Sequence, residues 1–158
     1  MPLGFRIKRR HRKVDAALVE RFRSIPVANV SDSMSRIAAA GPRLRPMHAG
    51  GVMAGPALTV KVRPGDNLML HRALDMAEPG DVIVVDAGGD LTTAIMGDLM
   101  LAHAKQRAVA GLVINGAVRD VDCIRAQDLP VFAAGVTHRG PTRTGPARST
   151  QPLPSTGW

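Results

Sequence analysis

The chain has 158 residues, of which 45% are apolar and only 3% aromatic, a composition that fits one packed domain with an aliphatic core. The lone cysteine, Cys123, excludes an internal disulfide and a CxxC metal site and suits a reducing cytoplasm. No apolar run approaches the roughly 20 residues that cross a bilayer, and no signal peptide is recognisable, so we expect a cytoplasmic protein without a membrane partner.

The net charge is +8, from 21 basic and 13 acidic residues, and much of the excess lies in "RIKRRHRK" at residues 6–13. A basic run can bind nucleic acid or another anionic partner. No aromatic residues interleave this run, so a base-stacking platform is not expected. We interpret residues 1–13 as a solvated basic arm, and we do not expect a nucleic-acid partner.

Two helices are predicted after the arm. The first covers residues 14–25 and carries apolar residues at a helical spacing, namely Val14, Leu18, Phe22 and Ile25. In the second, Ser31 or Asp32 would be the N-cap and Gly41 the stop. A loop over residues 41–51 and a strand within 53–66 then follow.

From residue 67 onward, helical patterns alternate with buried strands. Helices are predicted over 67–77, 97–109 and 121–129, and strands over 82–90, 111–120 and 130–135. Continuous Val and Ile runs that alternate with helices indicate parallel pairing with helices on the faces of the sheet. The fold class is therefore α/β, with a domain over residues 14–140. Residues 141–158, rich in Pro, Thr, Ser and Gly, are predicted to be a disordered tail.

The first candidate site is the start of the helix at Gly97–Met100. The first four N–H groups of a helix lack partners within it, and with the helix dipole they can bind an anion. Gly97 would let a carboxylate approach these amides closely. The alternative is that Asp98 only caps the helix, which is common.

The second candidate site is "INGAVRDVD", Ile114 to Asp122. A turn at Gly116 would bring Arg119 and Asp120 to the same rim. The planar guanidinium of an arginine matches a carboxylate, and an aspartate is a hard oxygen ligand suited to Mg²⁺. The alternative is a surface ion pair, which contributes roughly 0–1 kcal/mol.

Several segments in the right order resemble the RraA-like family over about Pro26 to Pro141. They are "PVANVSD", "GPALTVKVRPGDNLMLHRALDMAEPGDVIVVDAGGD", "GDLMLAHAKQRAVAGLVINGAVRDVD" and "LPVFAAGVTHRGP". The most specific part is Asp98, twenty residues, then Arg119-Asp120. The family contains the 4-hydroxy-4-methyl-2-oxoglutarate aldolases and the regulator of ribonuclease activity A.

The resemblance implies a layered sandwich with a mostly parallel sheet, assembled into trimers or hexamers. It also implies a metal-dependent, class II type aldolase that cleaves 4-hydroxy-4-methyl-2-oxoglutarate or 4-carboxy-4-hydroxy-2-oxoadipate to pyruvate and a second oxo-acid. Oxaloacetate decarboxylation would accompany this reaction, because both pass through the pyruvate enolate.

Carried over to this sequence, the resemblance assigns substrate binding to Arg119 and to the backbone of the helix start, namely Gly97, Asp98, Leu99 and Met100. Asp120 would bind the metal, Mg²⁺ or alternatively Mn²⁺. Arg119 and Asp98 are the catalytic candidates, and Asp98 could orient a water. The regulator branch, which binds ribonuclease E and can lack the acidic ligand after the arginine, is the alternative function, and Asp120 favours the enzyme.

The resemblance ends near Pro141. The family continues into "GPGEINVPV"-like sequence and further strands, whereas residues 145–158 read "GPARSTQPLPSTGW". We hypothesise a frameshifted or truncated gene product in which the C-terminal strands are missing. An inactive remnant, or a subunit that only associates with others, is therefore a third interpretation.

Overall fold

A computed structural model describes residues 6–8, 10–37 and 39–144. Its centre is a single sheet with the strand order β1-β6-β5-β3-β2, and β4 also pairs with β5. All pairs are parallel except β1 with β6. This confirms the predicted α/β class and the mostly parallel sheet. The strands are β1 (Arg45–Pro46), β2 (Ala57–Lys61), β3 (Val82–Asp86), β4 (Ala94–Met96), β5 (Gly111–Val118) and β6 (Val131–Val136).

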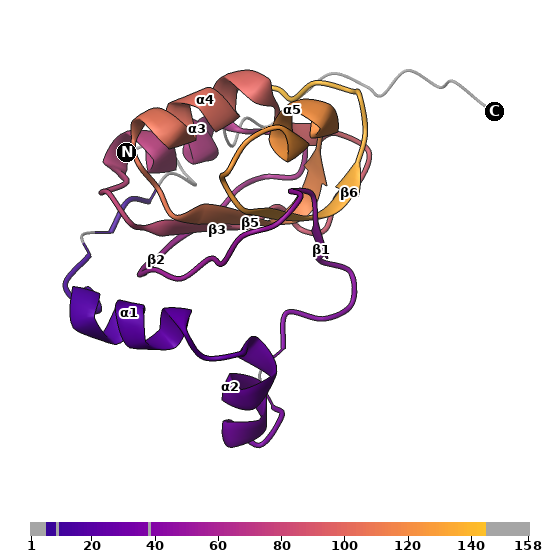
Figure 1. The fold of residues 1–158 in the computed structure, drawn as a ribbon. Coiled ribbons are helices and arrows are strands. Elements are labelled where there is room, and N and C mark those ends of the chain that lie inside the picture. The colour runs from indigo at the N-terminus through magenta and orange to yellow at the C-terminus, as the bar shows by residue number, and fades with distance from the viewer. Residues whose placement is uncertain (1–5, 9, 38, 145–158) are drawn as a thin grey trace.

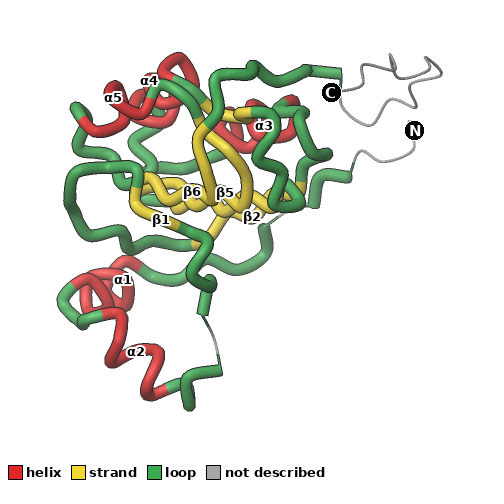
Figure 2. The backbone as a smooth tube through the Cα atoms, turned by 90° about the vertical axis from the view of Figure 1, so that its right-hand side faces the viewer, coloured by secondary structure: helices red, strands yellow, loops and turns green. Residues whose placement is uncertain are grey.

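The helices lie on both sides of this sheet, but only one side is closely packed. Figure 1 shows three helices above the sheet, namely α3 (Leu68–Met76), α4 (Asp98–Gln106) and α5 (Val121–Arg125). Helices α1 (Ala16–Arg23) and α2 (Val27–Ser33) lie below it, and Figure 2 shows the same separation from the side. Neither α1 nor α2 buries a residue. The core therefore lies between the sheet and the upper helices, with Leu70, Leu74, Ile83, Leu101, Leu112, Ile114 and Ile124 fully buried.

The second helix does not start where the sequence indicated. It begins after Pro26, and Ser31 and Asp32 lie inside it instead of capping it. Ser35 and Arg36 adopt left-handed φ values of 58° and 60°, which stops the helix before Gly41. The prediction was wrong because a proline can precede the first turn of a helix as well as a serine or an aspartate can cap it.

Gly116 was also misread. It lies within β5 and not at a turn, and the pairing of β5 with β6 shifts register between Ile114 and Ala117. A Cβ at Gly116 would lie 2.9 Å from the Ala87 Cβ, so the glycine provides room for a close neighbour. The chain turns later, at Asp120, whose φ of 56° and ψ of 43° are left-handed.

The segment after β6 folds back over the start of α3. Thr142 N–H donates to the Gly65 carbonyl at 2.8 Å, and the Thr142 carbonyl accepts from Asn67 N–H at 3.0 Å. The buried Asp66 carboxylate accepts from the Thr142 hydroxyl at 3.2 Å and from Thr144 N–H at 2.8 Å. Residues 141–144, the beginning of the predicted tail, are thus held to the domain, and residues 145–158 lie outside the described residues.

The basic arm is anchored at its end. Arg10 Nη1 lies 2.8 Å from Asp81 Oδ1, and Lys13 Nζ lies 2.6 Å from Glu78 Oε2. Burial raises the pKa of Asp81, but hydrogen bonds from Arg10 and from Glu78 N–H outweigh burial and leave this pKa below its ordinary value. Asp81 therefore stays ionised and holds the arm in place. In the described part of the chain, no helix is long and apolar enough to span a bilayer.

Candidate functional site

The site forms where β4 passes into α4. Gly97 is the N-cap of α4, with extended φ and ψ of −144° and −163° that any residue could adopt. Glycine leaves room for two charged side chains here, because a Cβ would lie 2.5 Å from Asp120 Oδ2 and 2.9 Å from Arg119 Nε and would push them away. Both groups belong to the chain itself, and the approach of a ligand carboxylate to these amides stays a prediction.

The left-handed conformation of Asp120 brings Arg119 and Asp120 to the same point. Arg119 N–H donates to the Met96 carbonyl at 2.9 Å, which fixes the end of β5 beside β4. Asp120 Oδ2 then accepts from Asp98 N–H at 3.0 Å and lies 3.5 Å from Arg119 Nε. Both side chains are partly exposed, at 39% for Arg119 and 35% for Asp120. The predicted pair is therefore more than a surface ion pair, because it also caps α4.

Asp98 is the first residue inside α4 and not its N-cap. Its Oδ1 accepts from Leu99 N–H at 2.7 Å, so the carboxylate turns back onto its own helix. Leu99 points outward and is 74% exposed, whereas Met100 is buried. Two of the predicted anion-binding amides, those of Asp98 and Leu99, are thus occupied by carboxylates of the chain.

The groups bound at the helix start are carboxylates. The Asp120 carboxylate lies where a helix dipole, an N–H group and a guanidinium favour negative charge. The carboxylate thus neutralises this positive end of the helix. Of the two carboxylate oxygens of Asp120, only Oδ2 accepts a hydrogen bond from the described residues, which leaves Oδ1 available to another partner.

The other wall of the site comes from residues that the sequence did not single out. Asn67 is buried, and its Nδ2 donates to the Ile95 carbonyl at 3.2 Å. In the described structure its Oδ1 is buried without a hydrogen-bond partner. Arg143 lies between Thr142 and Thr144, both bonded to Asp66, and lines the same small cavity as Asp98 and Arg119. The cavity at the helix start is thus lined by two arginines, Arg119 and Arg143.

The cavity has a volume of about 40 Å³. One water needs about 10–15 Å³ of such cavity space, so the site holds a few waters and is small for an oxo-acid. A ligand of that size would have to displace Asp120 from the amide of Asp98, or move the segment that carries Arg143. In the present arrangement the chain's own carboxylates occupy the amides at the helix start.

The donor set fits a hard divalent cation bound in an open manner. The described residues contain no cluster of three or more His, Cys, Asp or Glu side chains that could enclose a metal. Mg²⁺, however, is often held by one or two carboxylates, several waters and substrate oxygens. Asp120, with Oδ1 available, meets that requirement, and Asp98 lies next to it.

Replacing Gly97 with alanine tests this close approach. We expect Gly97→Ala to push the Asp120 carboxylate and the Arg119 guanidinium off the helix start, because both lie under 3.0 Å from the new Cβ. Their backbone positions would stay, since Gly97 has an ordinary φ. Chemical shifts of the Asp98 and Leu99 amides should change, while those of β3 should not. Gly41→Ala is a poor control because φ is 81° there, whereas Gly50 has open space and an ordinary φ. If Gly50→Ala gives the same shifts as Gly97→Ala, the site geometry is wrong.

Comparison with known proteins places this geometry in a family. The model of the family described as "RraA-like: Aldolase/RraA" matches residues 27–157. A curated relative from Halalkalibacterium halodurans, named "Putative 4-hydroxy-4-methyl-2-oxoglutarate aldolase", is 40% identical over 127 residues. That alignment covers 80% of this chain but 60% of the relative, so the chain spans about three fifths of that protein's length.

Solved structures agree on the fold. A Geobacillus kaustophilus protein titled S-adenosylmethionine:2-dimethylmenaquinone methyltransferase is 29% identical with a TM-score of 0.70, covering 77% of this chain and 76% of that one. The RNA-processing inhibitor RraA from Thermus thermophilis is 27% identical with a TM-score of 0.71, covering 82% and 79%. Since the family model matches most of the sequence and the fold agrees with these neighbours, the chain belongs to the RraA-like family.

Proposed function

We propose that this chain is a divalent-metal-dependent aldolase of the class II type that releases pyruvate from a 4-hydroxy-2-oxo acid. The observation that carries the proposal is the meeting of the Arg119 guanidinium, the Asp120 carboxylate and the Asp98 amide at one helix start. The name of the relative that is 40% identical supports the same reaction class. The substrates in view are 4-hydroxy-4-methyl-2-oxoglutarate and 4-carboxy-4-hydroxy-2-oxoadipate.

In this proposal the substrate carboxylate replaces the Asp120 carboxylate at the start of α4. The amides of Asp98 and Leu99 and the Arg119 guanidinium then bind the pyruvyl part, where negative charge develops as the carbon–carbon bond breaks. Fixed donors of this kind stabilise an enolate without a lysine Schiff base. Arg143 gives a second positive charge for the remaining carboxylate, which suits substrates with more than one anionic group.

Asp120, released from the helix amide, would hold the cation together with water and substrate oxygens. Such a cation supplies a Lewis acid that polarises the 2-oxo group. Asp98 would turn its Oδ1 from Leu99 N–H toward a water and orient it to take the proton of the 4-hydroxyl group. Oxaloacetate would lose carbon dioxide at the same site, because its cleavage also leaves the pyruvate enolate.

The experiment is to measure pyruvate release from these substrates and from oxaloacetate, with Mg²⁺, with Mn²⁺ and with excess EDTA. We expect turnover with either metal and a loss of at least about 100-fold with the chelator, because an enolate would lose its main electrostatic stabilisation. Adding back Mg²⁺ should restore the rate. Equal rates with and without EDTA would contradict the metal-dependent mechanism.

A non-catalytic regulator that binds ribonuclease E is the second candidate. It is favoured by the likeness to a structure titled as an RNA-processing inhibitor. A pull-down with purified ribonuclease E decides between the two. Binding that inhibits RNA cleavage, together with no pyruvate release under any metal, would favour the regulator over the enzyme, and the absence of both would favour an inactive remnant.

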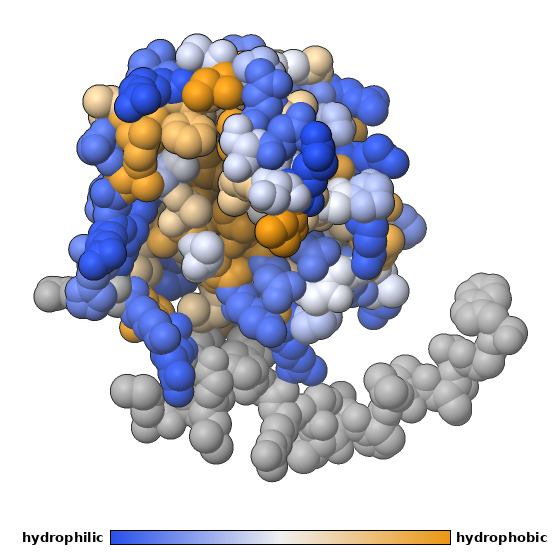
Figure 3. Space-filling view, turned by 90° about the horizontal axis from the view of Figure 1, so that it is seen from below, coloured by the Kyte–Doolittle hydropathy of each residue, from blue (hydrophilic) through white to orange (hydrophobic). Residues whose placement is uncertain are grey.

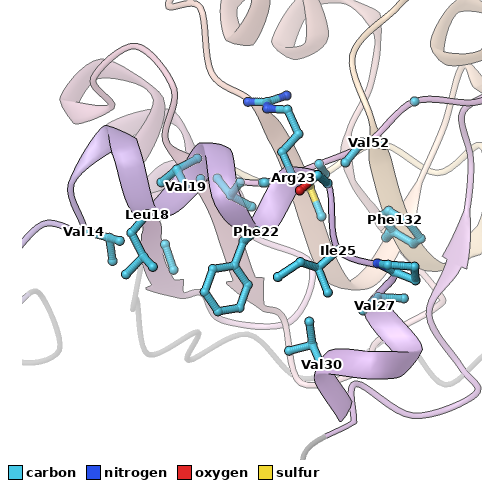
Figure 4. A pocket seen from close by; sticks show the side chains of 18 residues that line it. Val14, Leu18, Val19, Phe22, Arg23, Ile25, Val27, Val30, Val52 and Phe132 are labelled. Carbon is cyan, nitrogen blue, oxygen red and sulfur yellow. The ribbon is translucent and has the colours of Figure 1, made fainter. Parts of the chain in front are cut away.

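We further propose that the chain assembles into trimers or hexamers, as the family resemblance implies. The lower side of the molecule supports association. Figure 3 shows apolar side chains gathered there, and Figure 4 shows side chains of α1 and α2, such as Phe22, Ile25 and Val30, facing a groove toward Phe132 of the sheet. Val27 is 83% exposed.

Light scattering should therefore give a mass of three or six chains. We expect Phe22→Asp to lower it, because the new charge would enter an apolar groove of about 910 Å³. Arg21→Asp, on the same helix but outside this groove, is the matched control. A monomer at high concentration would refute the assembly.

A further inference from the structure

The outer edge of β2 is an unpaired strand edge. β2 is the last strand of the sheet and pairs only with β3. The Pro56 carbonyl accepts from Val82 N–H, and Val62 N–H donates to the Asp86 carbonyl, so the even-numbered residues direct their backbone groups to β3. The N–H and carbonyl groups of Ala57, Thr59 and Lys61 therefore face away from the sheet. In the described structure nothing pairs with them.

A cavity of about 500 Å³ runs along this edge. It lies between β2, helix α3 and the basic arm, and no acidic residue lines it. Its apolar lining includes Leu58, Met69 and Met76, which are partly buried or exposed. The cations that line it are Arg6, Lys8, Arg10, Lys61 and Arg72.

These cations are not all neutralised within the chain. Arg10 pairs with Asp81, and Lys61 and Arg72 make long contacts of 3.7 and 3.9 Å with Asp86 and Asp75. Arg6 and Lys8 form no ion pair with any described residue. Because Arg10 is tied to the fully buried Asp81, the arm keeps its charges beside the strand edge instead of carrying them into solvent.

We propose that this edge binds an extended acidic peptide of a partner protein by strand addition. Its backbone would pair with Ala57, Thr59 and Lys61, which supplies affinity without regard to sequence. Alternate side chains would meet the methionines or the cations, so the fitting peptide alternates apolar and acidic residues. Charge complementarity favours an acidic peptide over a basic one. The net charge of +8 would also speed the encounter of the acidic peptide with this chain. This site is separate from the proposed aldolase site.

The test is fluorescence anisotropy of the full chain with a labelled nonapeptide of alternating glutamate and valine. We expect saturable binding that Thr59→Pro weakens at least tenfold, because proline removes an outward N–H group without touching the bonds to β3. Thr59→Ala keeps that N–H and should bind the peptide as the wild type does.

The role of the cations is tested separately. The double variant Arg6→Ala/Lys8→Ala should also lower the affinity for the peptide tenfold. The control Arg12→Ala/Arg21→Ala, which removes two charges elsewhere, should change this affinity less than twofold.

Peptide variants keep the test valid if Thr59→Pro fails to fold. N-methylation of one alternate set of peptide residues should abolish binding to the wild type, and methylation of the other set should not, because an added strand uses one edge only. Equal binding of both methylated peptides, or no binding of the parent peptide, would overturn strand addition. Tighter binding of a twelve-nucleotide oligothymidine, lost in Arg6→Ala/Lys8→Ala, would assign the surface to nucleic acid instead.

Discussion

Replacing Asp120 with alanine is expected to lower pyruvate release by at least about 100-fold and to remove its dependence on Mg²⁺. The change deletes the proposed metal ligand and leaves the Arg119 guanidinium and the Asp98 amide without their present anionic partner. Steady-state kinetics across metal concentrations measures the first effect. A Mn²⁺ titration followed by electron paramagnetic resonance measures metal binding apart from turnover.

Asp120→Asn separates the metal role from the structural role. Asparagine keeps a carbonyl oxygen that can accept from Asp98 N–H, so the start of α4 should remain capped and the melting temperature nearly unchanged. Its activity should fall with that of the alanine variant, because the amide is neutral. Asp122→Ala, two residues away at an exposed position of α5, should keep full activity. Wild-type Mg²⁺ dependence in Asp120→Asn would rule Asp120 out as the metal ligand.

The second large effect is expected for Arg119→Lys, which should lower kcat/KM. The guanidinium lies between two backbone segments, since a Cβ at Gly97 would be 2.9 Å from Nε and one at Gly140 would be 3.0 Å from Nη1. This slot holds a flat group, and lysine has a single point charge on a flexible stem. We therefore expect kcat/KM to fall about 100-fold, or roughly 2.7 kcal/mol, although the charge is conserved.

The kinetic pattern identifies the contact that is lost. If Arg119 stabilises developing charge, kcat should fall with kcat/KM, and if it only binds the ground state, KM should rise alone. Arg125→Lys, at an exposed position of α5 outside the site, should stay within twofold of the wild type. Full activity in Arg119→Lys would show that the planar guanidinium has no role in the reaction. The proposal that Arg119 binds the substrate would then lack support.

Local patterns were enough for much of the fold and for part of the site. Buried Val and Ile runs predicted β3, β5 and β6, and apolar periodicity predicted α3 and α4, because these elements lie in the core where hydrophobic patterning decides structure. The family resemblance, whose most specific part is the spacing of Asp98 and Arg119-Asp120, indicated the three charged side chains that the structure brings to one helix start. The roles given to them stay predictions.

Other features depended on contacts between distant parts of the chain. The two-residue β1 and the three-residue β4 are too short to show a period, and they exist because β6 and β5 pair with them. Asn67 and Arg143 are 76 residues apart, and the bonds of Thr142 and Thr144 to residues 65–67 place both at the site. No local pattern indicates such a meeting.

The sequence by itself determined the α/β class, the family and the charged residues of the site, because residue type and spacing are properties of the chain alone. Only the tertiary structure decided how those residues meet. The turn lies at Asp120 and not at Gly116, since β5 stays paired through Gly116 and the left-handed residue comes after it. That position turns the Asp120 carboxylate onto the amide of Asp98, and no reading of either segment alone could show that the two would share a hydrogen bond.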